Sequence, residues 1–209
     1  MKEIFRYTLL ADGTSDEVLM PVIDWLIRQH LPDVRSVASF ARDFGKVGND
    51  LRSRIRAALK NFPCDLLFVH RDAESMTRED RIGEIVNAMD ELGTPHVPIV
   101  PIRMTEAWLL SDEEAIRFAS GNASGRHALN IPRRDRWEAL PDPKNTLLDI
   151  LKSASGKNGR ALDKFNPLKA RHLITPRSAS FDALRGVPSF DRFENDLIEQ
   201  LAKFSNVVD

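Results

Sequence analysis

Cysteine is almost missing from this chain of 209 residues, which contains only Cys64. One thiol excludes an internal disulfide and a zinc site built from several thiolates. Long apolar runs are missing as well. The apolar stretch near the N-terminus covers only a few residues before a charge and a glycine, too short for a signal-peptide core or a membrane span. We therefore expect a cytoplasmic protein with no membrane segment.

Three common catalytic and nucleotide-binding motifs are also missing. The chain has no Gly-x-x-x-x-Gly-Lys loop, no Gly-x-Gly-x-x-Gly turn and no Gly-x-Ser-x-Gly elbow. The histidines show no metal-ligand spacing and stand at positions 30, 70, 96, 127 and 172. His70 is a candidate proton carrier, although a histidine at a strand end is more often paired with a neighbour.

Charge is nearly balanced overall but uneven along the chain. The net charge is -1, yet residues 120–177 carry 12 basic and 5 acidic side chains, and the remainder carries 18 basic and 26 acidic ones. A partner with a phosphate backbone would select such a basic segment. A solvated helical surface that leans positive explains the same numbers equally well.

Short apolar runs alternate with segments of helical periodicity over the first part of the chain. Strands are expected at residues 4–10, 34–40, 65–70 and 96–103, and helices at 15–30, 49–61, 77–92 and 105–119. The run at 65–70 lacks polar alternation, which is typical of a strand buried on both faces. The alternation predicts an α/β fold, a Rossmann-like three-layer domain with a parallel sheet between helices.

The pattern changes beyond Gly121, where Gly, Pro and basic residues separate short helical stretches. We expect helices at residues 144–154, 167–173, 180–184 and 190–204. The sequence thus predicts an α/β domain at residues 1–120 and a basic helical extension at 121–209 that packs on it.

Acidic residues follow two of the expected strands. Asp12 comes just after the first, and Asp72 and Glu74 just after the third. Because parallel strands end at one edge of a sheet, these carboxylates are predicted to form a site there for a hard cation such as Mg²⁺. Alternatively, Thr14 and Glu17 form a capping box, and Asp12 is then only a turn residue.

Other charged residues extend this hypothesis. Glu106 follows the fourth strand and is a candidate fourth acid, although an acid in a first helical turn is favoured by the helix dipole alone. Arg71 lies beside Asp72. A group of basic residues suggests a polyanion track, although each alone reads as a surface residue: Lys144, Arg160, Lys164, Arg171 and Arg177.

Two of these segments carry a family resemblance. The sequences LLADGTSDE at residues 9–17 and LLFVHRDAE at 66–74 resemble the Toprim fold of topoisomerases, primases and overcoming-lysogenisation-defect nucleases, which places Glu-Gly after its first strand and Asp-x-Asp after a later one. The run EAWLL at 106–110 and DPK at 142–144 look like a group of small bacterial Toprim-like proteins, some associated with mobile-element or phage-defence loci and ATPase partners.

The resemblance implies Mg²⁺-dependent (or Mn²⁺-dependent) phosphoryl transfer on a nucleic-acid backbone. By position, Asp12 takes the place of the family's glutamate, Asp72 that of the first aspartate and Glu74 that of the second. The first and last exchanges alter reach by one methylene, and a displacement of roughly 1 Å can cost about a hundredfold in rate.

The leading hypothesis is a nuclease in which Asp12, Asp72 and Glu74 bind Mg²⁺ and Glu106 assists. Arg71 and Lys144 would stabilise phosphate charge, and the basic extension would hold the strand. A noncatalytic nucleic-acid-binding or regulatory subunit that works with an ATPase partner is the first alternative. A small-molecule phosphohydrolase is the second, and a homodimer stays open for all three.

Overall fold

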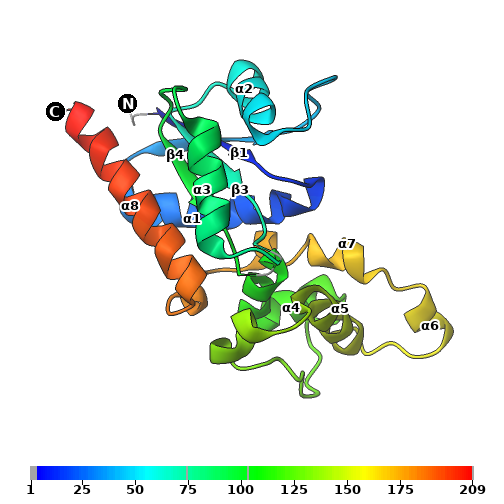
Figure 1. Ribbon diagram of the computed structural model, residues 1–209. Helices are drawn as coiled ribbons and strands as arrows, with labels where there is room; N and C mark the ends of the chain where they lie inside the picture. The colour runs from blue at the N-terminus through cyan, green and yellow to red at the C-terminus, as the bar shows by residue number, and fades with distance from the viewer. Residues whose placement is uncertain (1–3, 74, 103, 209) are drawn as a thin grey trace. The chain divides into compact units, whose positions relative to one another are not determined.

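The chain divides into two compact units. A computed structural model describes residues 4–73, 75–102 and 104–208 (Figure 1). The first unit comprises Met1–Val100 together with Asp191–Asp209, and the second comprises Pro101–Phe190. This division differs from the expected boundary at residue 120, because residues 101–120 group with the second unit and residues 191–209 group with the sheet.

The first unit is built on a four-stranded parallel sheet, which confirms the predicted α/β class. The strands are β1 (Ile4–Leu10), β2 (Arg35–Ala41), β3 (Leu66–His70) and β4 (His96–Ile99). Their order is β2-β1-β3-β4, and every neighbouring pair is parallel. Leu10 pairs with Val69, and Val69 with Pro98, so β1, β3 and β4 end close together at one edge.

One face of the sheet is covered by α2 (Leu51–Asn61) and α3 (Arg78–Met89). Buried apolar residues of both helices form one cluster with side chains of the sheet: Leu10, Leu51, Ile55, Ala58, Leu67, Val69, Ile85, Ala88 and Met89. Leu67 and Val69 alternate with Phe68, which points to the opposite face, as the two-residue period of a strand requires.

The opposite face is covered by α1 (Met20–His30) and α8 (Pro188–Val208). The ring of Phe68 lies edge-on to that of Phe193 of α8, with centroids 6.1 Å apart, and edge-on to that of Tyr7 at 5.4 Å. His30 Nε2 lies 3.0 Å from Glu194 Oε1, which ties α1 to α8. All five strand residues of β3 are buried, as expected for a strand between two helical layers.

The predicted helix at residues 15–30 begins differently from a continuous α-helix. A 3₁₀ helix, η1 (Thr14–Leu19), precedes α1, and Pro21 stands in the first turn of α1. Proline fits that position because the first amides of a helix have no partner inside it.

In the described part of the second unit, all regular structure is helical. Its helices are η2 (Thr105–Ser111), α4 (Glu113–Ala119), η3 (Arg134–Ala139), α5 (Pro143–Ala154), α6 (Arg160–Asp163), α7 (Pro167–Arg171), η4 (Thr175–Arg177) and η5 (Asp182–Leu184). Trp108 anchors its core: the indole Nε1 donates to Ser189 Oγ at 3.1 Å, and the ring lies edge-on to Phe190 at 5.3 Å.

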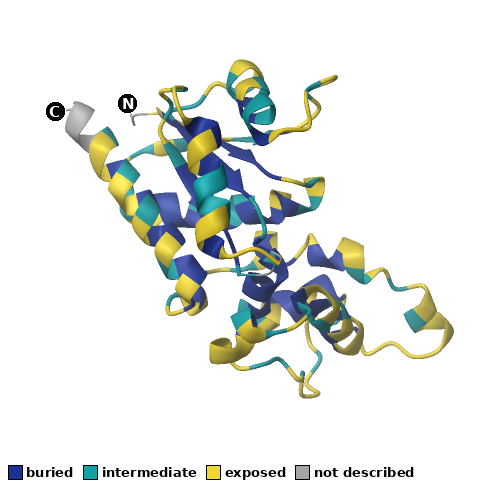
Figure 2. Cartoon of the chain, viewed as in Figure 1, coloured by how far each residue is buried: buried dark blue, intermediate teal, exposed yellow. Residues whose placement is uncertain are grey.

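Burial follows these packing faces (Figure 2). Strands β1, β3 and β4 are mostly buried, whereas the edge strand β2 is largely exposed or half-buried, and the helices alternate between buried and exposed residues. In α8, Phe193, Leu197 and Leu201 are buried at four-residue spacing, while Ile198 is 40% exposed. Among the described residues, no helix combines the length with the apolar character needed to cross a membrane.

The packing of α8 on the sheet makes a first prediction. Replacing Phe193 with alanine removes a ring with no exposed surface, so it should lower the free energy of unfolding by about 3–5 kcal/mol. Ile198→Ala on the same helix should cost less than about 0.5 kcal/mol. Urea unfolding of the two variants measures the difference, and equal effects would contradict the placement of α8.

Candidate functional site

His70 lies at the centre of the candidate site. It is the last residue of β3 and is 1% exposed. Its Nδ1 lies 3.0 Å from the carbonyl oxygen of Ile99 at the end of β4. Because a carbonyl only accepts, Nδ1 must carry the proton in this contact. The neighbouring strand therefore fixes both the tautomer and the orientation of the imidazole.

Two carboxylates face the other ring nitrogen. His70 Nε2 lies 3.6 Å from Asp72 Oδ1 and 3.8 Å from Asp16 Oδ2. Asp72 follows β3 and Asp16 follows β1, so the parallel pairing of these strands brings the two acids to the same edge. A histidine that donates one N–H to a backbone carbonyl and turns the other nitrogen toward carboxylates has the surroundings typical of metal sites.

Asp16 is held in place by its own loop. Its Oδ2 accepts from the backbone amide of Gly13 at 3.1 Å, and its Oδ1 accepts from Ser15 Oγ at 3.3 Å. The reciprocal capping contact thus joins Gly13 and Asp16, not Thr14 and Glu17. Sequence analysis selects Asp12 in this loop and misses Asp16. The feature of the sequence that could have identified Asp16 is its position three residues after Gly13. From there its carboxylate can accept a hydrogen bond from the backbone amide of Gly13.

Asp12, the acid expected from the sequence, is bound by two arginines. Arg54 Nη1 donates to its Oδ1 at 2.8 Å, and Arg71 Nε donates to its Oδ2 at 2.9 Å. Arg54 also donates to the carbonyl of Ala11 at 2.5 Å. Both carboxylate oxygens of Asp12 are therefore engaged, and Asp12 acts as a counter-ion in this arrangement.

Glu84 of α3 extends this ionic network. Arg71 Nη1 donates to Glu84 Oε1 at 2.6 Å, and Arg81 Nη1 donates to Oε2 at 2.8 Å. Burial acts to raise the pKa of Glu84, but the hydrogen bond from Arg81 and the charges of Arg71 and Arg81 outweigh it, so this pKa lies below its ordinary value. Arg54, Arg71 and Arg81 carry one positive charge more than the two acids that they bind, Asp12 and Glu84. This excess lies beside the carboxylates of Asp16 and Asp72.

The carboxylates beside His70 are of the type that a hard cation prefers, but they do not form a complete set of ligands for one. Glu74 lies outside the described residues. Among the residues that are described, no three His, Cys, Asp or Glu side chains stand close enough to hold one ion. Neighbouring ligands of octahedral Mg²⁺ are about 3.0 Å apart, given bonds of about 2.1 Å. If His70 Nε2 were itself a ligand, its contacts of 3.6 and 3.8 Å with the two carboxylates would be several tenths of an ångström too long.

Glu106 and Arg171 form a buried ion pair inside the second unit. Arg171 Nη1 lies 2.9 Å from Glu106 Oε1, and the side chains are only 4% and 5% exposed. The sequence hypothesis gave Glu106 a catalytic task and Arg171 a phosphate contact. The geometry instead gives both a structural partner, because residues 105–110 of η2, which include Glu106, are all buried.

The other expected phosphate-binding residues of the second unit lie at the surface. Lys144, Arg160 and Lys164 are exposed, which leaves their side chains accessible. Their contacts with phosphate stay a prediction. Arg177 instead lies over the ring of Phe118, with Cζ 4.3 Å from the centroid.

Comparisons with known proteins assign no family and no function to this chain. The chain matches no protein-family model, no curated protein and no solved structure. What the protein does must therefore be argued from its residues.

The buried ion pair makes a second prediction. Arg171→Met leaves Glu106 buried without its cation, so the free energy of unfolding should fall by about 3–5 kcal/mol. Removing both charges in Glu106→Leu/Arg171→Met should recover much of that loss. Urea unfolding followed by tryptophan fluorescence measures both variants.

Arg160→Met provides the matched control, because Arg160 is exposed. It should change stability by less than about 0.5 kcal/mol. If Arg171→Met unfolds like the wild type but binds nucleic acid more weakly, the expected phosphate contact of Arg171 stands and its structural role does not.

Proposed function

We propose that this protein is a Toprim-like nuclease that hydrolyses nucleic-acid phosphodiesters with Mg²⁺ or Mn²⁺. The observation that carries the proposal is the convergence of Asp16 and Asp72 on Nε2 of His70. The Toprim resemblance expects an acid after each of two strands, and the parallel pairing of β1 with β3 supports it. The resemblance assigns the first of these acids to Asp12, whereas Asp16 is the one that lies beside His70. The positive rim of arginines beside them suits a polyanionic substrate.

Asp16 and Asp72 are the proposed ligands of the ion, and Glu74 joins them through the resemblance. Carboxylate oxygens are the ligands that Mg²⁺ and Mn²⁺ prefer, so the residues fit the metal. When bound, the ion would neutralise charge on the scissile phosphate and make a water molecule more acidic.

The remaining residues take roles that follow from their contacts. His70 would accept the proton of the attacking water at Nε2, since Nδ1 is committed to Ile99. As the water oxygen bonds to phosphorus, the bond to the leaving oxygen breaks, and a proton returns to that oxygen. Arg54 and Arg71 would bind the phosphate, because guanidinium groups hold phosphate oxygens in pairs.

One contact favours a second candidate, a noncatalytic nucleic-acid-binding subunit that works with an ATPase partner. Asp12 occupies the position of the family's first acid, yet both its oxygens accept from arginines. With Asp12 held in this bridge, the site lacks the family's first acid as a metal ligand, and the protein would bind nucleic acid without cutting it.

Cleavage assays give the third prediction. With Mn²⁺ or Mg²⁺, the wild type should cut plasmid, single-stranded DNA or RNA, and Asp72→Asn and Asp16→Asn should each lose about a hundredfold or more in rate. Asp33→Asn is the matched control, because Asp33 is an exposed aspartate that precedes β2, at the opposite end of the strands.

The outcomes separate the candidates. Equal rates for all variants would remove the two acids from the site. A wild type that binds polymers but cuts none would favour the noncatalytic subunit. Turnover of mononucleotides alone would favour a small-molecule phosphohydrolase.

The bridge at Asp12 gives the fourth prediction. In EDTA, Asp12→Asn removes the anion that competes with phosphate for Arg54 and Arg71, so affinity for a single-stranded oligonucleotide should rise. A unit charge about 4 Å away is worth about 1 kcal/mol in water, which corresponds to roughly fivefold. Fluorescence anisotropy at fixed salt measures the change. If Asp33→Asn raises the affinity as much, the effect is only one of net charge.

A further inference from the structure

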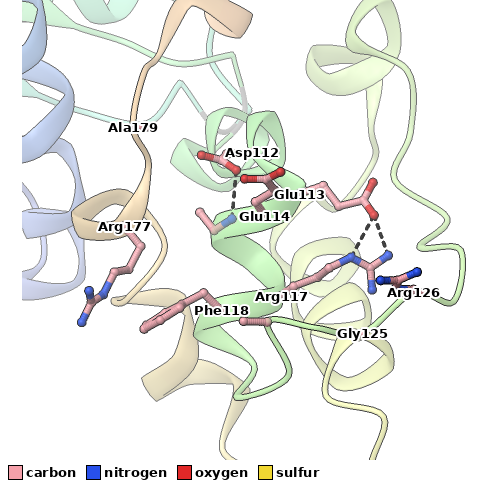
Figure 3. A pocket seen from close by; sticks show the side chains of 11 residues that line it. Asp112, Glu113, Glu114, Arg117, Phe118, Gly125, Arg126, Arg177 and Ala179 are labelled. Carbon is pink, nitrogen blue, oxygen red and sulfur yellow. Dashed lines mark hydrogen bonds and ion pairs between the residues drawn. The ribbon is translucent and has the colours of Figure 1, made fainter.

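The second unit contains a pocket of about 1010 Å³ that none of the proposed nuclease residues lines (Figure 3). This volume is at the upper end of the range for small-molecule sites. Its charged wall consists of three acids and three arginines: Asp112, Glu113, Glu114, Arg117, Arg126 and Arg177. The balance of signs means that the pocket as a whole does not simply attract polyanions.

Some of these charges already have partners within the unit. Arg117 donates to Glu113 Oε1 through Nε at 3.0 Å and through Nη2 at 2.5 Å. Asp112 Oδ1 accepts from the amide of Ala115 at 2.9 Å. Within the described part of the chain, Glu114 and Arg126 have no ion pair, so they are the side chains available to a ligand.

Arg117 is buried and incompletely satisfied. It is 8% exposed, and its Nη2 donates to the carbonyl of His127 at 2.6 Å in addition to Glu113. Its Nη1 is buried and has no hydrogen-bond partner among the described residues. A buried charged donor without an acceptor costs free energy, so an oxygen supplied from the pocket would be stabilising there.

Arg126 is presented by a loop that is fixed on both sides. The Asn122 side chain donates to the carbonyl of Ala154 at 2.9 Å, and His127 Nε2 lies 2.9 Å from the carbonyl of Ser153. Gly125 fits this turn, because a Cβ there would lie 2.5 Å from Asn122 Nδ2 and the Asn122 side chain would have to move. A guanidinium on such a loop loses little freedom when it binds an anion.

An aromatic platform lies in the same pocket. Phe118 is 43% exposed, and the guanidinium of Arg177 lies over its ring. Exposed aromatic rings and arginine planes are the surfaces on which proteins stack nucleobases. Figure 3 shows Arg177 and Phe118 on one side of the view and Arg117 and Arg126 on the other.

We propose that this pocket binds a nucleotide unit, with its phosphate at Arg126 and its base stacked on Phe118 and Arg177. Glu114 accepts from the amino groups of the base, which explains why acids line a site for an anion. Arg117, whose buried Nη1 lacks an acceptor among the described residues, stands in the wall of the same pocket. This site is independent of the proposed nuclease centre, and its nucleotide is either free or part of a single strand.

Calorimetry in EDTA tests the proposal, because no metal-dependent cleavage takes place there. Guanosine 5′-monophosphate, guanosine, inorganic phosphate and a single-stranded oligonucleotide are titrated into the full chain. Guanosine 5′-monophosphate should bind at least about tenfold more tightly than phosphate or guanosine alone, since it makes both kinds of contact. An oligonucleotide that binds more tightly still, through the same residues, identifies a strand as the source.

Substitutions at the exposed residues Arg126 and Phe118 test the proposal without disturbing the fold. Arg126→Ala should weaken binding about tenfold or more, and Phe118→Leu should weaken it by removing the stacking ring. Arg133→Ala is the matched control, because Arg133 is 83% exposed and pairs with Asp135 at 3.2 Å. Absence of binding by any ligand, equal binding of phosphate alone, or full affinity in Arg126→Ala would overturn the proposal.

Discussion

The parallel pairing of β1 with β3 is the constraint on which the candidate site depends. Its register runs from Tyr7 opposite Leu66 to Leu10 opposite Val69, so the loops after the two strands begin side by side. Asp16 and Asp72 are far apart in sequence, and only this pairing gives them a common neighbour in His70. The next strand completes the arrangement, because β4 supplies the carbonyl of Ile99 that orients the imidazole.

Electrostatics at this edge combine two opposite requirements. A divalent cation needs carboxylates, while a phosphate backbone needs arginines. Asp16 and Asp72 lie beside His70, whereas Asp12 and Glu84 are neutralised by arginines. Asp12 itself bridges Arg54 and Arg71 in this arrangement.

Sequence reasoning succeeded where local pattern decides the outcome. The apolar runs and helical periodicities predicted the strands and the place of Asp72, because these depend on neighbours along the chain. The alternation of strands with helices predicted the parallel sheet. It did not find Asp16, whose burial follows from the turn at Gly13 and from the packing of β3. Burial of the Glu106–Arg171 pair and the return of α8 to the sheet depend on contacts between distant segments, for which the sequence contains no local signal.

The central claim is that Asp16 and Asp72 form a divalent-metal site, and calorimetric titration of Mn²⁺ tests it most directly. The account predicts one saturable site in the wild type that Asp72→Asn loses and Asp33→Asn keeps. Binding that is unchanged in Asp72→Asn, or no binding to the wild type at millimolar Mn²⁺, would contradict the account. The two aspartates would then be a turn residue and a partner for His70, and nothing more.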